Sequence, residues 1–238
     1  DKVHKRTMIG QHLLSWSTNW DAAMSKLRAR GLPLPKIVGG DATELSWNNA
    51  ALEGLVNYGK AGHIIVLTWH PSNPTNPSYG THFHNLTTTQ FKQMLDDSTT
   101  IGQNWQAEID KIAPVLQRFQ QNNIPVVFKP LHEQNAEWFW WGHNQVAGKA
   151  LADRQLAFRN VWKDLVKNLT QDKGLDNLLF LFAASTVTYD KTVATTTYYP
   201  GSDLVDIVGI DVYQEQLNLG GSRIGKQHYV ELSKTGKP

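Results

Sequence analysis

The sequence has no cysteine, no long apolar run and no cluster of like charges. Without cysteine, neither a disulfide nor thiolate chemistry is available, although 238 residues can bury a core that needs no covalent crosslink. The longest wholly apolar stretch, residues 178–184, is far shorter than the roughly 20 residues of a membrane-spanning helix. Basic residues number 23 against 21 acidic ones. These features argue against a membrane span and against nucleic acid as the main partner.

Tryptophan, in contrast, is abundant, with nine in the chain. Its ring favours surfaces that are apolar on one side and wet on the other, so the excess points to a cleft for flat, hydroxyl-bearing ligands such as sugars. The length favours one domain over residues 1–238. The residues from Asp1 onward do not resemble a signal peptide, and the lack of cysteine is compatible with secretion.

Short apolar runs alternate with longer segments of helical period, which is typical of repeated βα units around a parallel sheet. Strands are predicted at residues 7–12, 36–41, 63–70, 125–133, 178–185 and 204–213. Helices are predicted between them, at residues 19–30, 50–58, 105–122 and 151–169. Residues 71–88 are predicted to form a long loop, and long loops in small domains usually serve a site.

Each predicted strand ends in polar residues: Gln11 and His12, Asp41, His70, His132 and Glu133, Ser185, and Asp211 to Tyr213. The ligand site of a (β/α)8 TIM barrel is built from such ends, so one shared pocket in an α/β barrel is predicted. A Rossmann-type sheet is the structural alternative. It needs a Gly-rich turn after the first strand, whereas residues 11–18 contain no glycine. Because only 25 residues follow Tyr213, the chain is predicted to supply about six strands.

The most informative segment covers residues 129–142 and reads Lys-Pro-Leu-His-Glu-Gln-Asn-Ala-Glu-Trp-Phe-Trp-Trp-Gly. Its Glu133, at the mouth of a predicted strand and followed by aromatic residues, suits a carboxylic acid held over a sugar platform. Glycoside hydrolysis needs such an acid of raised pKa to protonate the leaving oxygen, together with a second carboxylate. The alternative is that Glu133 is an exposed loop carboxylate and the tryptophans are local core.

This segment resembles the acid/base signature of glycoside hydrolase family 26, whose principal members are endo-β-1,4-mannanases. Further similarity to that family lies in Ile-Gly-Gln-His at residues 9–12, Ile-Val-Gly-Gly-Asp at 37–41, Val-Leu-Thr-Trp-His at 66–70 and Asp-Ile-Val-Gly-Ile-Asp-Val-Tyr at 206–213. The resemblance thus covers nearly the whole chain. It implies a TIM barrel, a retaining glycoside hydrolase without a cofactor, and a β-mannan-type polysaccharide or oligosaccharide as substrate.

The resemblance also implies catalytic roles for three residues. Glu133 would be the general acid/base, which first protonates the glycosidic oxygen and then deprotonates the attacking water. His132 would hold the nucleophile by a hydrogen bond, and Tyr213 would do so from the sixth strand. On its own, a tyrosine that ends an apolar strand is more often a packing residue.

A second group of residues would bind the substrate. By the resemblance, His70 would hydrogen-bond the sugar that precedes the scissile bond, and Trp138 would stack on it. Trp69, Trp141 and Asp41 are included in the same predicted substrate-binding group. Without the resemblance, a histidine at a strand end is about equally often a hydrogen-bonded core residue.

The nucleophile is the point at which the sequence departs from the family pattern. A retaining enzyme needs a second carboxylate about 5 to 5.5 Å from the first, and the family carries it as a Glu at the end of the seventh strand. Residues 234–238 resemble the approach to that strand, so the nucleophile is expected just beyond Pro238. Glu215 and Glu231 are the only glutamates after Glu137, and neither has the expected position.

Other interpretations remain open from the sequence alone. A β-glycan-binding protein without the nucleophile would bind and not cut, and family 26 also contains β-1,3-xylanases and mixed-linkage β-glucanases. His82 and His84, with His70 and His132, could be a metal cluster, but histidines near a polysaccharide cleft are the preferred reading, and no metal is expected. Asn85 and Asn168 lie in N-glycosylation patterns short enough to occur by chance. We expect a monomer, secreted or at the cell surface.

Overall fold

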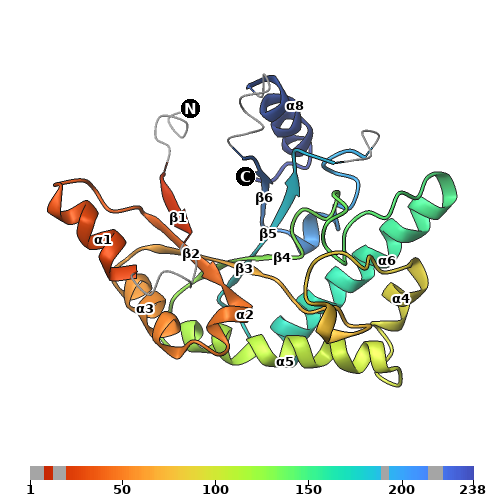
Figure 1. Ribbon diagram of the computed structural model, residues 1–238, viewed down its shortest axis with the longest axis horizontal. Coiled ribbons are helices and arrows are strands. Elements are labelled where there is room, and N and C mark those ends of the chain that lie inside the picture. Colours follow the sequence, from red (N-terminus) through yellow and green to blue (C-terminus); the bar gives the residue numbers. More distant parts are fainter. Residues whose placement is uncertain (1–7, 13–19, 189–192, 214–221) are drawn as a thin grey trace.

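The computed structural model describes residues 8–12, 20–188, 193–213 and 222–238. Within them, parallel strands form one curved sheet in the order β1-β2-β3-β4-β5-β6, and the helices lie on its outside (Figure 1). The strands are β1 (Gly10–His12), β2 (Ile37–Asp41), β3 (Ile64–Trp69), β4 (Val126–Pro130), β5 (Leu178–Ser185) and β6 (Ile207–Asp211). The predicted architecture, about six strands of a (β/α)8 barrel, is confirmed.

The helices follow the strands as βα units require. They are α1 (Trp20–Ala29), α2 (Ala42–Leu45), α3 (Asn49–Lys60), α4 (Thr88–Gln93), α5 (Thr100–Gln120), α6 (Gly148–Lys167) and α8 (Ser222–Ser233). The four helices predicted from the sequence before residue 170 are present as α1, α3, α5 and α6. Among the described residues, no helix is both long and apolar enough to cross a membrane.

The prediction placed the start of α5 five residues too late, at Trp105. The helix begins at Thr100 because the Thr99 side chain accepts a hydrogen bond from the backbone N–H of Gly102, at 2.9 Å. Such a cap satisfies a donor that the first helical turn leaves unpaired. The short helices α2 and α4 were also not predicted. Both are capped by side chains, Asp41 and Thr87 respectively, and each is too short for its period to be visible in the sequence.

The two faces of the sheet differ in residue size and polarity. Outward side chains pack against the helices and are fully buried, as at Val38, Leu67, Phe128 and Phe182. Their strand neighbours point to the other face, because successive side chains in a strand alternate. Many of these inward positions are small or polar, and Gly39, Thr68, Lys129, Ala183 and Gly209 all line one cavity, together with the apolar Ile37, Val66 and Leu181. The sheet thus keeps its aromatic core on the outside and leaves room on its concave face for a cavity that contains polar groups.

The outer edge of β6 has a contact with the end of the described chain. The backbone N–H of Val208 donates to the carbonyl oxygen of Pro238 at 2.9 Å. Helix α8 packs on β6 and delivers the chain to this edge. The last residue therefore lies where a further strand would pair with β6.

Candidate active site

A cavity of about 770 Å³ opens on the concave face of the sheet, along the inward positions and the carboxyl ends of its strands. Six residues at predicted strand ends line it: Gln11, His12, His70, His132, Asp211 and Tyr213. The prediction that polar strand ends share one pocket is therefore confirmed for these six, whereas Asp41, Glu133 and Ser185 are not among the lining residues. Lining residues to which the sequence did not point include Thr68 and Lys129.

Glu133 lies beside this cavity in an unusual backbone conformation. Its φ is 55° and that of Leu131 is 45°, in the left-handed region that costs a non-glycine residue free energy and is frequent at functional sites. The backbone N–H of Glu133 donates to the Ala183 carbonyl at 2.8 Å, which anchors the turn to β5. The side chain is only 3% exposed. The alternative interpretation of Glu133 as an exposed carboxylate is wrong.

The surroundings of the Glu133 carboxyl group favour its protonated form. Burial and the nearby Asp211 carboxylate raise the pKa of Glu133 from 4.5 to about 7. The indole N–H of Trp138 donates to Glu133 Oε2 at 2.7 Å, whereas Oε1 is buried without a hydrogen-bond partner among the described residues. Burial raises the pKa of the Tyr213 hydroxyl, and the Glu133 charge adds to this, so the two groups are close. A carboxylic acid that is protonated near neutral pH can serve as a general acid.

His132 is a neutral imidazole next to the acid. Burial holds its pKa well below 6.5, and the positive charge of Lys129 acts in the same direction. Its ring packs edge-on against His70 at 4.7 Å and against Phe139 at 5.1 Å between centroids. Its Nδ1 is buried without a partner among the described residues, so it remains available for a hydrogen bond.

Two of the predicted substrate-binding tryptophans are fully buried, which corrects that part of the prediction. Trp69 has 0% exposure and packs against Trp105, at 5.4 Å between ring centroids, on the helix side of the sheet. Trp141 also has 0% exposure and donates its indole N–H to the His132 carbonyl at 2.7 Å. Neither ring can reach a ligand in the cavity. Trp141 instead fixes the backbone of the segment that carries Glu133.

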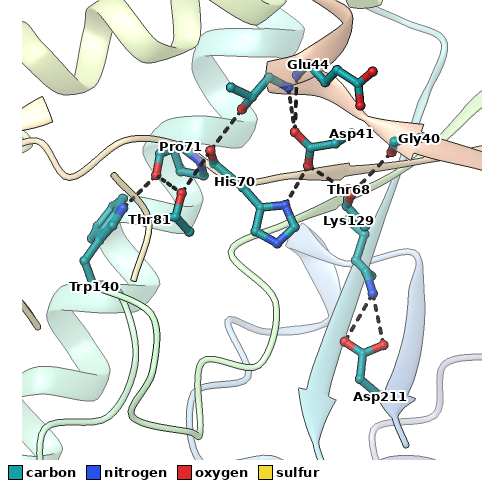
Figure 2. A network of polar contacts seen from close by, with 11 residues as sticks. Gly40, Asp41, Glu44, Thr68, His70, Pro71, Thr81, Lys129, Trp140 and Asp211 are labelled. Carbon is teal, nitrogen blue, oxygen red and sulfur yellow. Dashed lines mark hydrogen bonds and ion pairs between the residues drawn. The ribbon is translucent and has the colours of Figure 1, made fainter. Parts of the chain in front are cut away.

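Asp41 is engaged by protein donors and does not line the cavity. One carboxylate oxygen caps helix α2, and the other accepts hydrogen bonds from Thr68 Oγ1 at 3.0 Å and His70 Nδ1 at 2.6 Å, as Figure 2 shows. Asp41 was predicted to bind the substrate, but its carboxylate instead holds the ring of His70 in place. Because Nδ1 of His70 faces Asp41, its Nε2 is the nitrogen left for other partners.

Lys129 and Asp211 form an ion pair on the inward face of the sheet, also visible in Figure 2. The ammonium group lies 3.0 Å and 3.1 Å from the two carboxylate oxygens. Both side chains are mostly buried. This pair was not predicted from the sequence, although the sequence contains a signal for it: Lys129 interrupts the otherwise apolar run from Val126 to Leu131. A charged residue at an inward strand position usually has a partner.

The histidines of the loop after β3 pack against aromatic rings. His82 stacks on Phe139, with 5.2 Å between centroids, and His84 stacks on Tyr79 at 4.0 Å. Within the described parts of the chain, no three His, Asp or Glu side chains are placed to hold a metal ion.

Both glycosylation patterns are occupied by protein contacts. The Asn85 side-chain amide donates to the carbonyl of Phe139, and that of Asn168 to the Gln106 side chain, each at 2.6 Å. Glu215 lies outside the described residues. Glu231, on α8, accepts hydrogen bonds from the Thr195 and Thr196 hydroxyls and is not among the residues that line the cavity.

A family profile described as glycosyl hydrolase family 26 matches residues 38–228, which include all but the first residue of β2, the strands β3 to β6 and the Glu133 segment. The chain belongs to glycosyl hydrolase family 26. A mannan endo-1,4-beta-mannosidase of Bacillus subtilis is 35% identical over 162 residues, which are 67% of this chain and 42% of that protein. Another, from Bacillus subtilis strain 168, is 34% identical over 83% of this chain and 50% of its own length.

Solved structures of other proteins are similar to this chain in three dimensions. The Bacillus subtilis mannanase man26 superposes with a TM-score of 0.73 at 29% identity, over 87% of this chain and 65% of that one. The YdhT protein of Bacillus subtilis superposes with a TM-score of 0.79 at 29% identity, over 98% of this chain and 71% of that one. This family 26 chain thus spans about half the length, or less, of the curated relatives named above.

Proposed function

We propose that the protein of which this chain is part is an endo-acting, retaining glycoside hydrolase that cleaves β-1,4-mannosidic linkages in mannan, galactomannan or glucomannan. The observation that carries the proposal is Glu133, a buried carboxyl group beside the cavity whose pKa is raised to about 7. The names of its family 26 relatives supply the linkage.

In this mechanism, Glu133 gives its proton to the glycosidic oxygen while a second carboxylate would form a bond to the anomeric carbon and the bond to the leaving sugar breaks. With its proton gone, the same carboxylate then takes a proton from the water that releases the sugar from the enzyme. Trp138, whose indole N–H contacts Glu133, stabilises the ionised state between the two steps. His70, held by Asp41, and Trp138 are proposed to bind the sugar that precedes the scissile bond.

The second carboxylate is proposed to lie on a seventh strand that follows Pro238. The hydrogen bond from Val208 to Pro238 supports this, because it sets the backbone of Pro238 beside β6. A side chain at the end of such a strand would be next to Tyr213 and within the same concave face. His132 and Tyr213 are proposed to hold that nucleophile by hydrogen bonds. Since mannans are extracellular polymers, we also propose that the protein acts outside the cell or at its surface. We propose that it does so as a monomer.

The decisive experiment uses the full-length protein with mannan and with an aryl β-mannoside that has an activated leaving group. The Glu133→Ala variant should lose nearly all hydrolysis of mannan and retain formation of the glycosyl-enzyme from the aryl substrate, because a good leaving group departs without an acid. Glu231→Gln is the matched control, since this carboxylate does not line the cavity; it should hydrolyse both substrates at the wild-type rate.

The stereochemistry and the products complete the test. Proton NMR of the first product should show the β anomer, as a retaining enzyme requires, and chain length should fall early, as in endo cleavage. Full activity of Glu133→Ala on mannan would remove Glu133 from the mechanism. Tight mannan binding without any hydrolysis by the full-length protein would favour a β-glycan-binding protein instead.

A further inference from the structure

The Lys129–Asp211 ion pair spans three strands of the sheet. Lys129 is on β4 and Asp211 is at the end of β6, while β5 lies between these strands. The pair therefore crosses the inward face of β5. It can do so because the inward side chain there is Ala183, paired in register with Gly209 on β6, so that no bulky group stands between the two charges.

Glu133 is anchored at this crossing point. Its backbone N–H bonds to the carbonyl of Ala183, the β5 residue that the ion pair spans. The charged and titratable groups that act on its carboxyl come from every neighbouring element: Asp211 and Tyr213 from β6 and the residues after it, Lys129 from β4, and His70 from the end of β3. Among these groups, only Asp211 carries a negative charge, which disfavours ionisation of Glu133.

We propose that Lys129 and Asp211 are positioning residues for Glu133: Asp211 adds to burial in favouring the protonated acid, and Lys129 limits that effect by compensating the Asp211 charge. The proposal rests on the proposed role of Glu133 as general acid. An unpaired Asp211 would raise the pKa of Glu133 further, and an unpaired Lys129 would lower it. The pair thus sets the pH range in which Glu133 can act.

The two single substitutions should shift the pKa of Glu133 in opposite directions, which makes the proposal testable. Asp211→Asn leaves the Lys129 cation uncompensated, so the pKa of Glu133 should fall. Lys129→Met leaves the Asp211 anion uncompensated, so the pKa of Glu133 should rise. Each change should be about one pH unit, the size typical of a neighbouring charge that is partly screened. The double variant should return close to the wild-type value, and Lys129→Arg, which keeps the charge, should do the same.

The measurement is the ¹³C carboxyl chemical shift of Glu133 against pH in the full-length protein, assigned by its absence in Glu133→Gln. Lys149→Met is the control, because Lys149 forms an exposed ion pair with Asp153 on α6. The alkaline limb of kcat/KM on mannan should move with the titration midpoint in each variant. Unfolding curves identify any variant that has lost its structure. If Lys129→Met has lost its structure, the titration midpoints of Lys129→Arg and of the double variant are compared with that of Asp211→Asn.

The outcomes separate this inference from the proposed function. Midpoints that move in opposite directions in the two single variants support the inference, even in a protein that proves unable to hydrolyse mannan. Midpoints that stay fixed, or move in the same direction in both folded variants, overturn it and leave the ion pair with a purely structural role. Hydrolysis of mannan with unmoved midpoints would keep the proposed function and reject the inference.

Discussion

Replacing Glu133 with glutamine should stabilise the protein at alkaline pH, because the folded state holds this carboxyl group in surroundings that favour its neutral form. A pKa raised from 4.5 to about 7 corresponds to about 3 kcal/mol of free energy of unfolding. The stability linked to the protonated group is fully present below pH 4.5 and is lost as the pH rises through about 7. Glutamine is neutral throughout and nearly isosteric, so it avoids that loss.

Urea unfolding of wild type and Glu133→Gln between pH 4 and pH 8 measures the effect. The two proteins should be similar in stability at pH 4, and the variant should gain about 3 kcal/mol on wild type by pH 8, with unchanged dependence on urea concentration. Most of the gain should occur between pH 4.5 and 7, where only the unfolded wild-type chain has released this proton.

Glu231→Gln is a control of opposite sign. Although burial alone acts to raise the pKa of Glu231, hydrogen bonds from Thr195 and Thr196 outweigh it and lower the pKa. That carboxylate therefore stabilises the folded protein above pH 4.5, and its replacement should destabilise at pH 8. If wild type and Glu133→Gln lose stability in parallel between pH 4.5 and 7, Glu133 is ionised as easily in the folded protein as in the unfolded chain, and the argument for a buried acid fails.

Three further substitutions test how the Glu133 segment is held. Trp138→Phe removes the hydrogen bond that favours the ionised carboxyl, so the alkaline limb of kcat/KM should move up by about one pH unit; no movement would show that the bond has no effect on the acid. Asn135→Ala removes the side-chain partners of the backbone N–H and C=O of Ser185 in the interior, so it should lower the free energy of unfolding, measured with urea, by about 2 to 4 kcal/mol. A variant as stable as wild type would contradict this. Gly142→Ala would set a Cβ 2.1 Å from the carbonyl oxygen of Ala136, so it should destabilise by about 3 kcal/mol or more and lower mannan hydrolysis; a stable, active variant would show that the turn can rearrange.

The sequence by itself determined the elements and the edge of the sheet at which the site lies. Apolar runs of strand length alternate with helical periods, and parallel strands bring their carboxyl ends to one side, so polar residues such as His70, His132 and Tyr213 had to meet. The histidine, glutamate and tryptophans of residues 129–142 pointed to Glu133 as the candidate acid, because the pattern lies within one short segment and is visible without knowledge of distant contacts.

Only the tertiary structure decided which side chains face the cavity and which groups set their charge. Trp69 directly precedes His70, and because side chains alternate along β3, one of the two faces the helices and the other faces the cavity. A strand that is apolar on both faces does not show from its sequence which of the two residues faces the cavity. The pair of Lys129 and Asp211 joins residues 82 apart in the chain. Their meeting depends on the register of three strands and on a small residue on the strand between them, and a single sequence contains no local signal for either.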